Sequence, residues 1–325
     1  MSLFSLPRPG TTTTTPQAPI AAPSEADFTK TFGQLLPPAS FLTTPQGTAA
    51  FYDLPPSTTP SASSPPPDRV LLIHGVQTPA LGMFPLARAL QTSFPGKHLA
   101  LVDLWGHGLS ETPVQPHEPA LFHGLIDAVL DRLGWPSAHI VGYSFGGALA
   151  VGYVNSRPAR VQSLALVAPA GLIPSAGVGD GVAALRGDDA AAAWAWTLDF
   201  LEGGELVVPP DWRERVARGE VVAPAIKEWQ MREHAGHKAA VVAIVRDGRI
   251  MDDDEAFVRA AKSGVPAVGV VGELDGVCSG DQLRAVGFAD VVVVPEAGHG
   301  VVRDNAAEVA AAIGAFWKGL SSKTS

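Results

Sequence analysis

A serine, an aspartate and a histidine, far apart in the chain, have the types and order that nucleophilic catalysis requires. Ser144 is the middle residue of the string G-Y-S-F-G at 142–146. A serine hydroxyl is a weak nucleophile at neutral pH, so it needs a base, and the base needs a carboxylate that orients it. His299 is the predicted base and Asp275 the predicted acid. The order Ser, Asp, His is the one expected for a serine in this type of string.

Other groups are needed around these three residues. Glu273 is an alternative acid, but chain order and loop position favour Asp275. Attack on a carbonyl creates an oxyanion, which two backbone amides can stabilise. The amide of Phe145, directly after the serine, is one predicted donor, and the amide of Val76 is the other.

Candidate substrate-binding residues come from two parts of the chain. Tyr143 and Gln77 adjoin the predicted nucleophile and the predicted oxyanion donor. Trp194, Trp196 and Trp229 lie in a long stretch with helical character. Large aromatic side chains there either line a substrate pocket or pack the stretch itself, and the sequence leaves both interpretations open.

Apolar runs without polar alternation predict the strands that position these residues. Such runs are typical of parallel strands buried on both faces, and here helices alternate with them. The predicted strands are 69–75, 98–104, 138–141, 163–169, 266–272 and 291–294, and the helices between and after them are 79–94, 119–133, 148–154, 280–285 and 305–317. A further pair of strands is predicted on either side of the turn at 45–47. Ligands bind at the carboxyl ends of parallel strands, and the reactive residues that follow those ends are His74, Asp103, Ser144, Asp275 and His299.

The domain organisation follows from where the alternation stops. Residues 1–36 are rich in threonine and proline and predict a flexible tail that buries little surface. Residues 37–171 and 264–325 form the predicted α/β core. Residues 172–263 are too long for a loop in a compact domain, so they predict an inserted helical lid.

These motifs together resemble the α/β-hydrolase superfamily, in its Ser-His-Asp branch with a helical lid. The resemblance covers about residues 40–318 and rests on the following segments: His74-Gly75, D-x-W-G-H-G-x-S at 103–110, the nucleophile elbow at 142–146, 272–275 and 297–300. It implies a mostly parallel central sheet flanked by helices. It also implies that His74 braces the oxyanion loop, and that Asp103 and His107 fix neighbouring loops.

The resemblance implies a serine hydrolase that cleaves an ester, thioester or lactone of a mainly apolar small molecule through an acyl-serine intermediate. The superfamily also holds acyltransferases, cyclases, lyases and receptors. Biosynthetic acyl transfer, cyclisation or condensation on the same fold is therefore the alternative, and a ligand-binding, receptor-like module is a third interpretation. A serine at the elbow argues against relatives that need a carboxylate nucleophile there, such as haloalkane dehalogenases.

Composition limits the partners. The formal net charge of −9 argues against nucleic acids and anionic membrane surfaces. Cys278 is the single cysteine, so no intrachain disulfide can form. The sequence has no secretory or membrane-spanning run, so we expect a cytoplasmic protein. We expect neither a cofactor nor a metal: His234 and His237 share one helix face but lack a third ligand, so they predict a polar lid surface. A homodimer is left open.

Overall fold

The computed structural model describes residues 3–11, 17–58, 68–178 and 181–323. They form an eight-stranded sheet with the order β1-β2-β4-β3-β5-β6-β7-β8. The strands are β1 Ser40–Thr44, β2 Gly47–Leu54, β3 Arg69–Ile73, β4 His98–Val102, β5 Ala138–Tyr143, β6 Val161–Val167, β7 Ala267–Gly272 and β8 Val291–Val294. β2 pairs antiparallel with β1 and with β4, and every other pair of neighbours is parallel. The predicted mostly parallel sheet is therefore confirmed.

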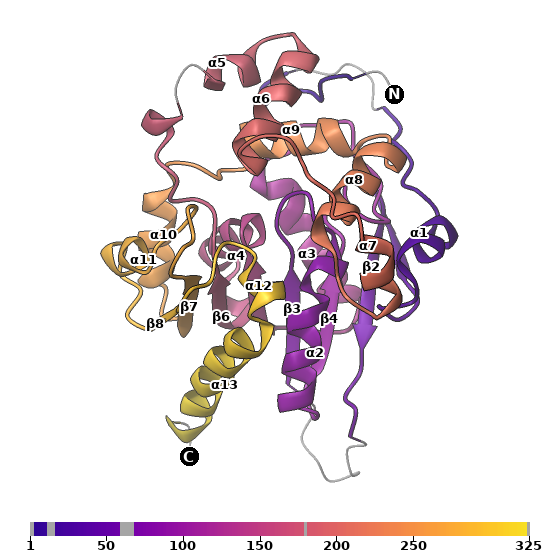
Figure 1. The fold of residues 1–325 in the computed structure, drawn as a ribbon. Coiled ribbons are helices and arrows are strands. Elements are labelled where there is room, and N and C mark those ends of the chain that lie inside the picture. The colour runs from indigo at the N-terminus through magenta and orange to yellow at the C-terminus, as the bar shows by residue number, and fades with distance from the viewer. Residues whose placement is uncertain (1–2, 12–16, 59–67, 179–180, 324–325) are drawn as a thin grey trace.

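Helices cover both faces of the sheet, as buried parallel strands require (Figure 1). Alternate residues of β3 show the two layers: Leu71 packs into one apolar core and Leu72 into the other. On the Leu71 side lie α3 Pro119–Arg132, α4 Phe145–Ser156, α10 Asp254–Ala261 and α11 Gly280–Ala285. On the Leu72 side lie α2 Phe84–Ser93, α12 Val301–Asp304 and α13 Ala306–Lys323.

Some helix bounds differ from the predicted ones. The predicted helix 79–94 begins as a short 3-10 turn, after which α2 starts with a proline in its first turn. The predicted last helix is longer, because α13 runs on to Lys323. The 3-10 turns are η1 Ala80–Met83, η2 Pro158–Arg160 and η3 Ser175–Gly177.

The chain between β6 and β7 is helical, as expected. It forms α5 Gly181–Arg186, α6 Ala190–Glu202, α7 Trp212–Ala217, α8 Ala223–Glu233 and α9 His237–Asp247 before α10. In Figure 1, α6, α8 and α9 lie above the sheet, whereas α10 lies beside α4. The amide of Asn155 on α4 donates a hydrogen bond of 2.9 Å to the Ala256 carbonyl on α10. The predicted subdomain 172–263 therefore includes α10, which packs beside α4 of the core.

The predicted flexible tail, residues 1–36, is wrong for its described part. Residues 25–32 form α1 Glu25–Phe32, whose amino end is capped by the Ser24 hydroxyl. Phe28 and Phe32 are buried, and each lies edge-on against Trp229 of α8, with ring centroids 5.2 and 5.9 Å apart. This segment is ordered by a partner about two hundred residues later in the chain. Most of the threonine run, residues 12–15, lies outside the described residues.

No helix in the described part of the chain is both long and apolar enough to cross a membrane.

Candidate active site

The turn between β5 and α4 presents Ser144 at the rim of the sheet. Its backbone has φ 53° and ψ −119°, a conformation that residues other than glycine rarely adopt. The flanking glycines make this turn sterically feasible. A Cβ atom at Gly142 would overlap the Gly146 carbonyl, and one at Gly146 would overlap the Ile73 carbonyl on β3. The elbow predicted at 142–146 thus has the strained geometry that its glycines indicate.

The structure brings Ser144, His299 and Asp275 into one hydrogen-bonded chain. His299 follows β8, and its Nε2 lies 3.1 Å from the Ser144 hydroxyl oxygen. Its Nδ1 lies 3.1 Å from each carboxylate oxygen of Asp275, which follows β7. The Asp275 side chain is fully buried, and the Val277 amide donates a hydrogen bond of 2.8 Å to it. A buried carboxylate so placed holds the imidazole with Nε2 free to accept the serine proton.

The alternative acid, Glu273, lies elsewhere. It is exposed, and one of its carboxylate oxygens accepts a hydrogen bond of 2.9 Å from the Glu296 amide. Glu273 therefore joins two loops to each other and does not contact His299.

The loop after β3 is fixed by two buried histidines. His74 Nδ1 donates to the Gly75 carbonyl at 2.6 Å, and its Nε2 accepts a hydrogen bond from the Leu104 amide at 2.9 Å. Burial lowers the pKa of His74 to about 4, so the ring is neutral and can accept at Nε2. His107 Nε2 accepts from the Gln77 amide at 3.1 Å. These contacts agree with the bracing roles that the resemblance implies.

This loop passes close to the serine. A Cβ atom at Gly75 would lie 2.8 Å from the Ser144 Cβ. Val76 follows directly, and among the described residues neither its amide nor that of Phe145 donates a hydrogen bond to another protein group. Both amides therefore lack a protein acceptor among the described residues, and their role as oxyanion donors stays a prediction.

Asp103 fixes the loop below the site and does not contact His299. Its carboxylate accepts hydrogen bonds from the amides of Ala80 and Leu109 at 2.8 and 3.0 Å, and from the Tyr52 hydroxyl at 2.9 Å. Burial raises the pKa of Asp103 to about 6. The three hydrogen bonds favour the charged form and so partly oppose this rise.

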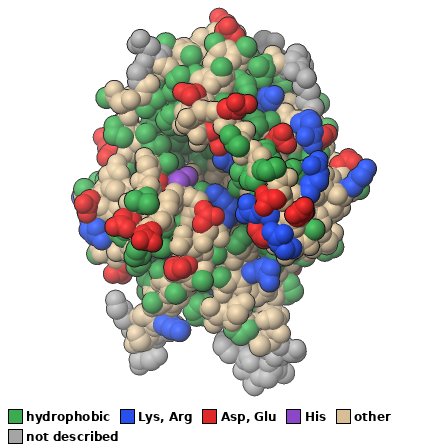
Figure 2. All heavy atoms as spheres, in the orientation of Figure 1, with side chains coloured by type: hydrophobic (Ala, Val, Ile, Leu, Met, Phe, Trp, Pro, Cys, Tyr) green, Lys and Arg blue, Asp and Glu red, His purple; other side chains and the backbone are tan. Residues whose placement is uncertain are grey.

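A cavity of about 340 Å³ opens at Ser144. The core supplies Val76, Gln77, Tyr143, Ser144, Phe145, His299 and Arg303. The helical segment between β6 and β7 supplies Ile173, Phe200, Leu201, Glu202, Lys227 and Ile250. Figure 2 shows this face with a hollow bordered by hydrophobic side chains, a histidine within it and basic side chains beside it. Gln77 and Tyr143 line this cavity, and their role in substrate binding stays a prediction.

None of the three tryptophans lines this cavity, which favours the packing interpretation over the pocket interpretation that the sequence also left open. Trp229 packs against α1 through Phe28, and Trp194 is largely buried beneath Lys238, whose ammonium lies 5.7 Å from the ring centroid. Trp196 stacks on Phe200 at 5.2 Å and thus supports a residue that does line the cavity. Aromatic type alone did not distinguish packing from pocket lining.

Sequence reasoning missed the charged residues of the cavity. Lys227 on α8 forms an ion pair of 2.6 Å with Glu202 on α6, which joins two helices of the inserted segment. Arg303 on α12 donates a hydrogen bond of 3.4 Å to the Tyr143 hydroxyl. The spacing of Arg303, four residues after His299, was the available signal for it; Lys227 and Glu202 had none, because tertiary packing alone brings them together.

His234 and His237 are buried, so the predicted polar lid surface is wrong at these residues. His234 donates to the Ser110 carbonyl at 2.9 Å and His237 to the Gly106 carbonyl at 2.8 Å. Burial lowers the pKa of His234 to about 4 and that of His237 to about 3, so both are neutral. They join the inserted helices to the loop after β4.

Gln230 on α8 makes a second connection between the inserted helices and the core. Its amide nitrogen donates to the Gln77 carbonyl, and its oxygen accepts from the Gly108 amide at 2.7 Å. Gln230 is fully buried. The loop that carries the predicted oxyanion donor is therefore held from the core side by His107 and from the inserted side by Gln230.

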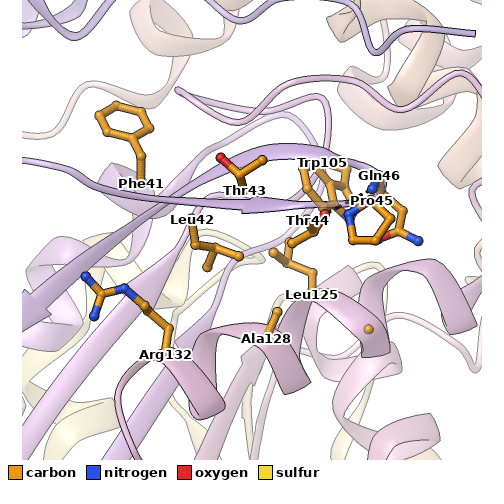
Figure 3. A pocket seen from close by; sticks show the side chains of 11 residues that line it. Phe41, Leu42, Thr43, Thr44, Pro45, Gln46, Trp105, Leu125, Ala128 and Arg132 are labelled. Atoms are coloured by element: carbon orange, nitrogen blue, oxygen red, sulfur yellow. Dashed lines mark hydrogen bonds between the residues drawn. The ribbon is translucent and has the colours of Figure 1, made fainter.

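A second hollow, of about 510 Å³, lies between the β1–β2 turn and α3 (Figure 3). Leu42, Thr44, Leu125 and Arg132 are among the residues that line it, and none of the predicted catalytic residues does.

Cys278 is buried and its pKa is raised to about 12 by burial, so its thiol is protonated at neutral pH. The described residues contain no cluster of three or more histidine, cysteine, aspartate or glutamate side chains that could hold a metal ion.

The family model for the alpha/beta hydrolase fold matches residues 68–232, which span β3 to α8 and include the elbow. The chain belongs to the α/β-hydrolase fold family. The enol-lactonase of Burkholderia xenovorans has a similar structure, with a TM-score of 0.64 and 18% identity over 86% of this chain and 100% of the other. At that level of identity the likeness concerns the fold alone.

Curated relatives of this α/β-hydrolase match parts of it. The dihydrolipoyllysine-residue acetyltransferase component of the acetoin cleaving system of Pseudomonas putida is 28% identical over 220 residues, or 66% of this chain and 54% of the relative. Lipase LipV of Mycobacterium tuberculosis is 34% identical over 141 residues, or 40% of this chain and 52% of the relative. The chain thus spans about half the length of these two relatives.

Proposed function

We propose that this chain is a serine hydrolase that cleaves an ester, thioester or lactone of a small, mainly apolar molecule. The observation that carries the proposal is the hydrogen-bonded chain from Asp275 through His299 to Ser144, at the floor of a cavity. Family membership and the names of relatives, a lipase and a poly(3-hydroxyalkanoate) depolymerase among them, support ester hydrolysis.

The proposed reaction has an acylation step and a deacylation step. The Ser144 oxygen attacks the carbonyl carbon while His299 Nε2 takes the hydroxyl proton, and Asp275 stabilises the resulting imidazolium. The amides of Val76 and Phe145 donate to the oxyanion. The tetrahedral intermediate collapses, His299 protonates the leaving alcohol or thiol, and the acyl group stays on Ser144. Water, deprotonated by His299, then attacks the acyl carbon; the bond to Ser144 breaks, His299 returns the proton to the serine oxygen, and the acid is released.

We also propose that the inserted helices act as the lid. α6 supplies Phe200 and Leu201 to the cavity wall and the connection after α9 supplies Ile250, so the acyl or alcohol portion of the substrate would lie against an apolar surface. In this proposal the lid is the part of 172–263 that precedes α10, since α10 packs on the core.

The test uses a fluorophosphonate probe and a series of nitrophenyl esters of increasing chain length. We expect covalent labelling and ester turnover by the wild type, and neither by Ser144→Ala. Ser156→Ala is the matched control, because Ser156 is exposed at the far end of the same helix, α4. Equal labelling of Ser144→Ala and the wild type, or a folded wild type with neither labelling nor turnover, would refute the proposal.

Acyl transfer is the second candidate, because two curated relatives are named acetyltransferase components. Transfer would use the same acyl-Ser144 intermediate, and a bound nucleophile would replace water. Products formed from a nitrophenyl ester in the presence of an acceptor alcohol or thiol separate the two candidates. We expect the free acid to predominate; a predominant transfer product would favour this second candidate.

A further inference from the structure

Arg303 presents a cation at the cavity, and no carboxylate among the described residues forms an ion pair with it. It lines the cavity four residues after His299, on α12. Within the described part of the chain, no carboxylate oxygen lies within 4.0 Å of its guanidinium nitrogens. Nη2 donates to the Tyr143 hydroxyl, whereas Nη1 is buried and has no hydrogen-bond partner. An unpaired buried guanidinium nitrogen is unfavourable, and a ligand acceptor would offset that cost.

The other charges at the cavity do not compensate Arg303. Lys227 and Glu202 pair with each other at 2.6 Å, so together they add no net charge. Asp304 is adjacent in sequence, but its side chain is exposed and forms no ion pair with Arg303 among the described residues. The lining residues therefore carry one net positive charge; the Asp275 carboxylate is hydrogen-bonded behind His299 and does not line the cavity.

Gln77 adds an independent observation at the same cavity. Its side chain is only 2% exposed, yet neither its amide nitrogen nor its oxygen has a hydrogen-bond partner. Buried polar groups in folded proteins are nearly always paired, so an unpaired carboxamide that lines a cavity points to a ligand that pairs with it. A polar ligand group is thus expected next to the apolar wall formed by Phe200, Leu201 and Ile250.

We propose that Arg303 determines specificity by binding a carboxylate of the substrate, so that this site takes esters or lactones that also carry a free carboxylate. The planar guanidinium matches a carboxylate through paired N–H donors, better than it matches a neutral group. Tyr143, which donates to the His299 carbonyl at 3.0 Å, holds the guanidinium beside the proposed catalytic residues. The inference rests on the proposed hydrolase function.

The test compares charged and neutral esters with the same leaving group. The charged substrates are the mono(4-nitrophenyl) esters of succinate, glutarate and adipate, and the neutral reference is 4-nitrophenyl hexanoate. For the best charged ester, we expect Arg303→Gln to lower the ratio of kcat/KM values, charged over neutral, by about 10- to 100-fold, the range for a hydrogen bond to a charged group. Arg303→Lys should restore part of this preference.

Arg259→Gln is the matched control, because it removes the same charge from an exposed position on α10 outside the cavity. It should keep the wild-type preference. Circular dichroism and the thermal midpoint establish that each variant is folded. Tyr143→Phe, which removes the hydroxyl but no charge, should lower the preference less than Arg303→Gln does.

Several outcomes would overturn the inference. One is a wild type that hydrolyses the hexanoate ester but prefers none of the three charged esters; this would leave the proposed hydrolase function intact. Another is an Arg303→Gln variant that loses both activities equally, which would make Arg303 a positioning residue for Tyr143 and His299. A wild type that cleaves no ester and is not labelled at Ser144 would instead refute the proposed function on which the inference rests.

Discussion

Asp275 and Glu273 are two residues apart, and the structure places them in different surroundings. Asp275 is buried against His299, whereas Glu273 is exposed and accepts from the Glu296 amide. We expect Asp275→Asn to lower kcat for a nitrophenyl ester by about 10⁴-fold, because an amide favours the wrong tautomer of the histidine. Glu273→Gln should change kcat by less than about threefold, since Glu273 makes no contact with the imidazole. The reverse result would show that the acid is misassigned.

Gly146 permits close packing of the elbow against β3. A Cβ atom there would overlap the Ile73 and His74 carbonyls, both of which are backbone groups that cannot rotate away. We expect Gly146→Ala to lower the free energy of unfolding by about 3 kcal/mol or more, as other strongly overpacked sites do. Gly124→Ala is the matched control, because a Cβ at this α3 position meets no atom within 4 Å.

Urea unfolding measures both glycine variants. The control should gain about 0.5–1 kcal/mol, the difference in helix propensity between alanine and glycine. If Gly146→Ala is as stable as the wild type, the elbow is less tightly packed than the structure indicates.

At the scale of elements, α1 is held by contacts with the inserted segment. We expect Phe28→Ala to lower the free energy of unfolding by about 3–5 kcal/mol, because the Phe28 side chain on α1 is buried against Trp229 on α8. Phe41→Ala on β1 is the control, since Phe41 is 47% exposed, and its effect should stay below about 1 kcal/mol. Equal, small effects in urea unfolding would mean that residues 25–32 behave as the free tail predicted from composition.

The sequence predicted those elements whose signal is local. β3 to β8 appear as short apolar runs, and the elbow is recognisable because its glycines and serine are adjacent. The contacts of α1 could not be predicted, because Trp229 lies about two hundred residues away and nothing local marks it as a partner. For the same reason Phe200 and Lys227 escaped notice. The buried His234 and His237 were mistaken for surface residues, because the burial of a polar side chain depends on its partner, here the loop at 103–111.

At the scale of the whole molecule, buried neutral histidines should make the protein sensitive to acid. Burial lowers the pKa to about 4 for His74, His117, His123, His139 and His234, and to about 3 for His237. In the unfolded chain each titrates near 6.5, so between pH 6.5 and 4 the unfolded state binds more protons and the stability falls as the pH falls. Asp103, with its pKa raised to about 6, acts in the opposite direction but is a single group.

We therefore expect the thermal midpoint to fall steadily from pH 7 to pH 5. Each such histidine contributes at most about 2 kcal/mol at pH 5, and Asp103 offsets less than one of them. His123→Gln should flatten the profile, because glutamine can still donate to the Leu149 carbonyl but does not titrate. A midpoint that is constant over this range would show that the histidines are hydrated in solution.

The homodimer left open by the sequence stays a prediction, and light scattering would test it by measuring the molar mass in solution.

The connection through Gln230 has a consequence for protein engineering. Exchanging the segment between β6 and β7 with that of a relative is an obvious way to alter substrate preference, since this segment forms much of the cavity wall. Such a graft would also remove the donor to the Gln77 carbonyl and the acceptor of the Gly108 amide. Chimaeras that retain α8 and exchange only α5 and α6 should keep a competent backbone beside Ser144, and those that replace α8 should lose rate on every substrate alike.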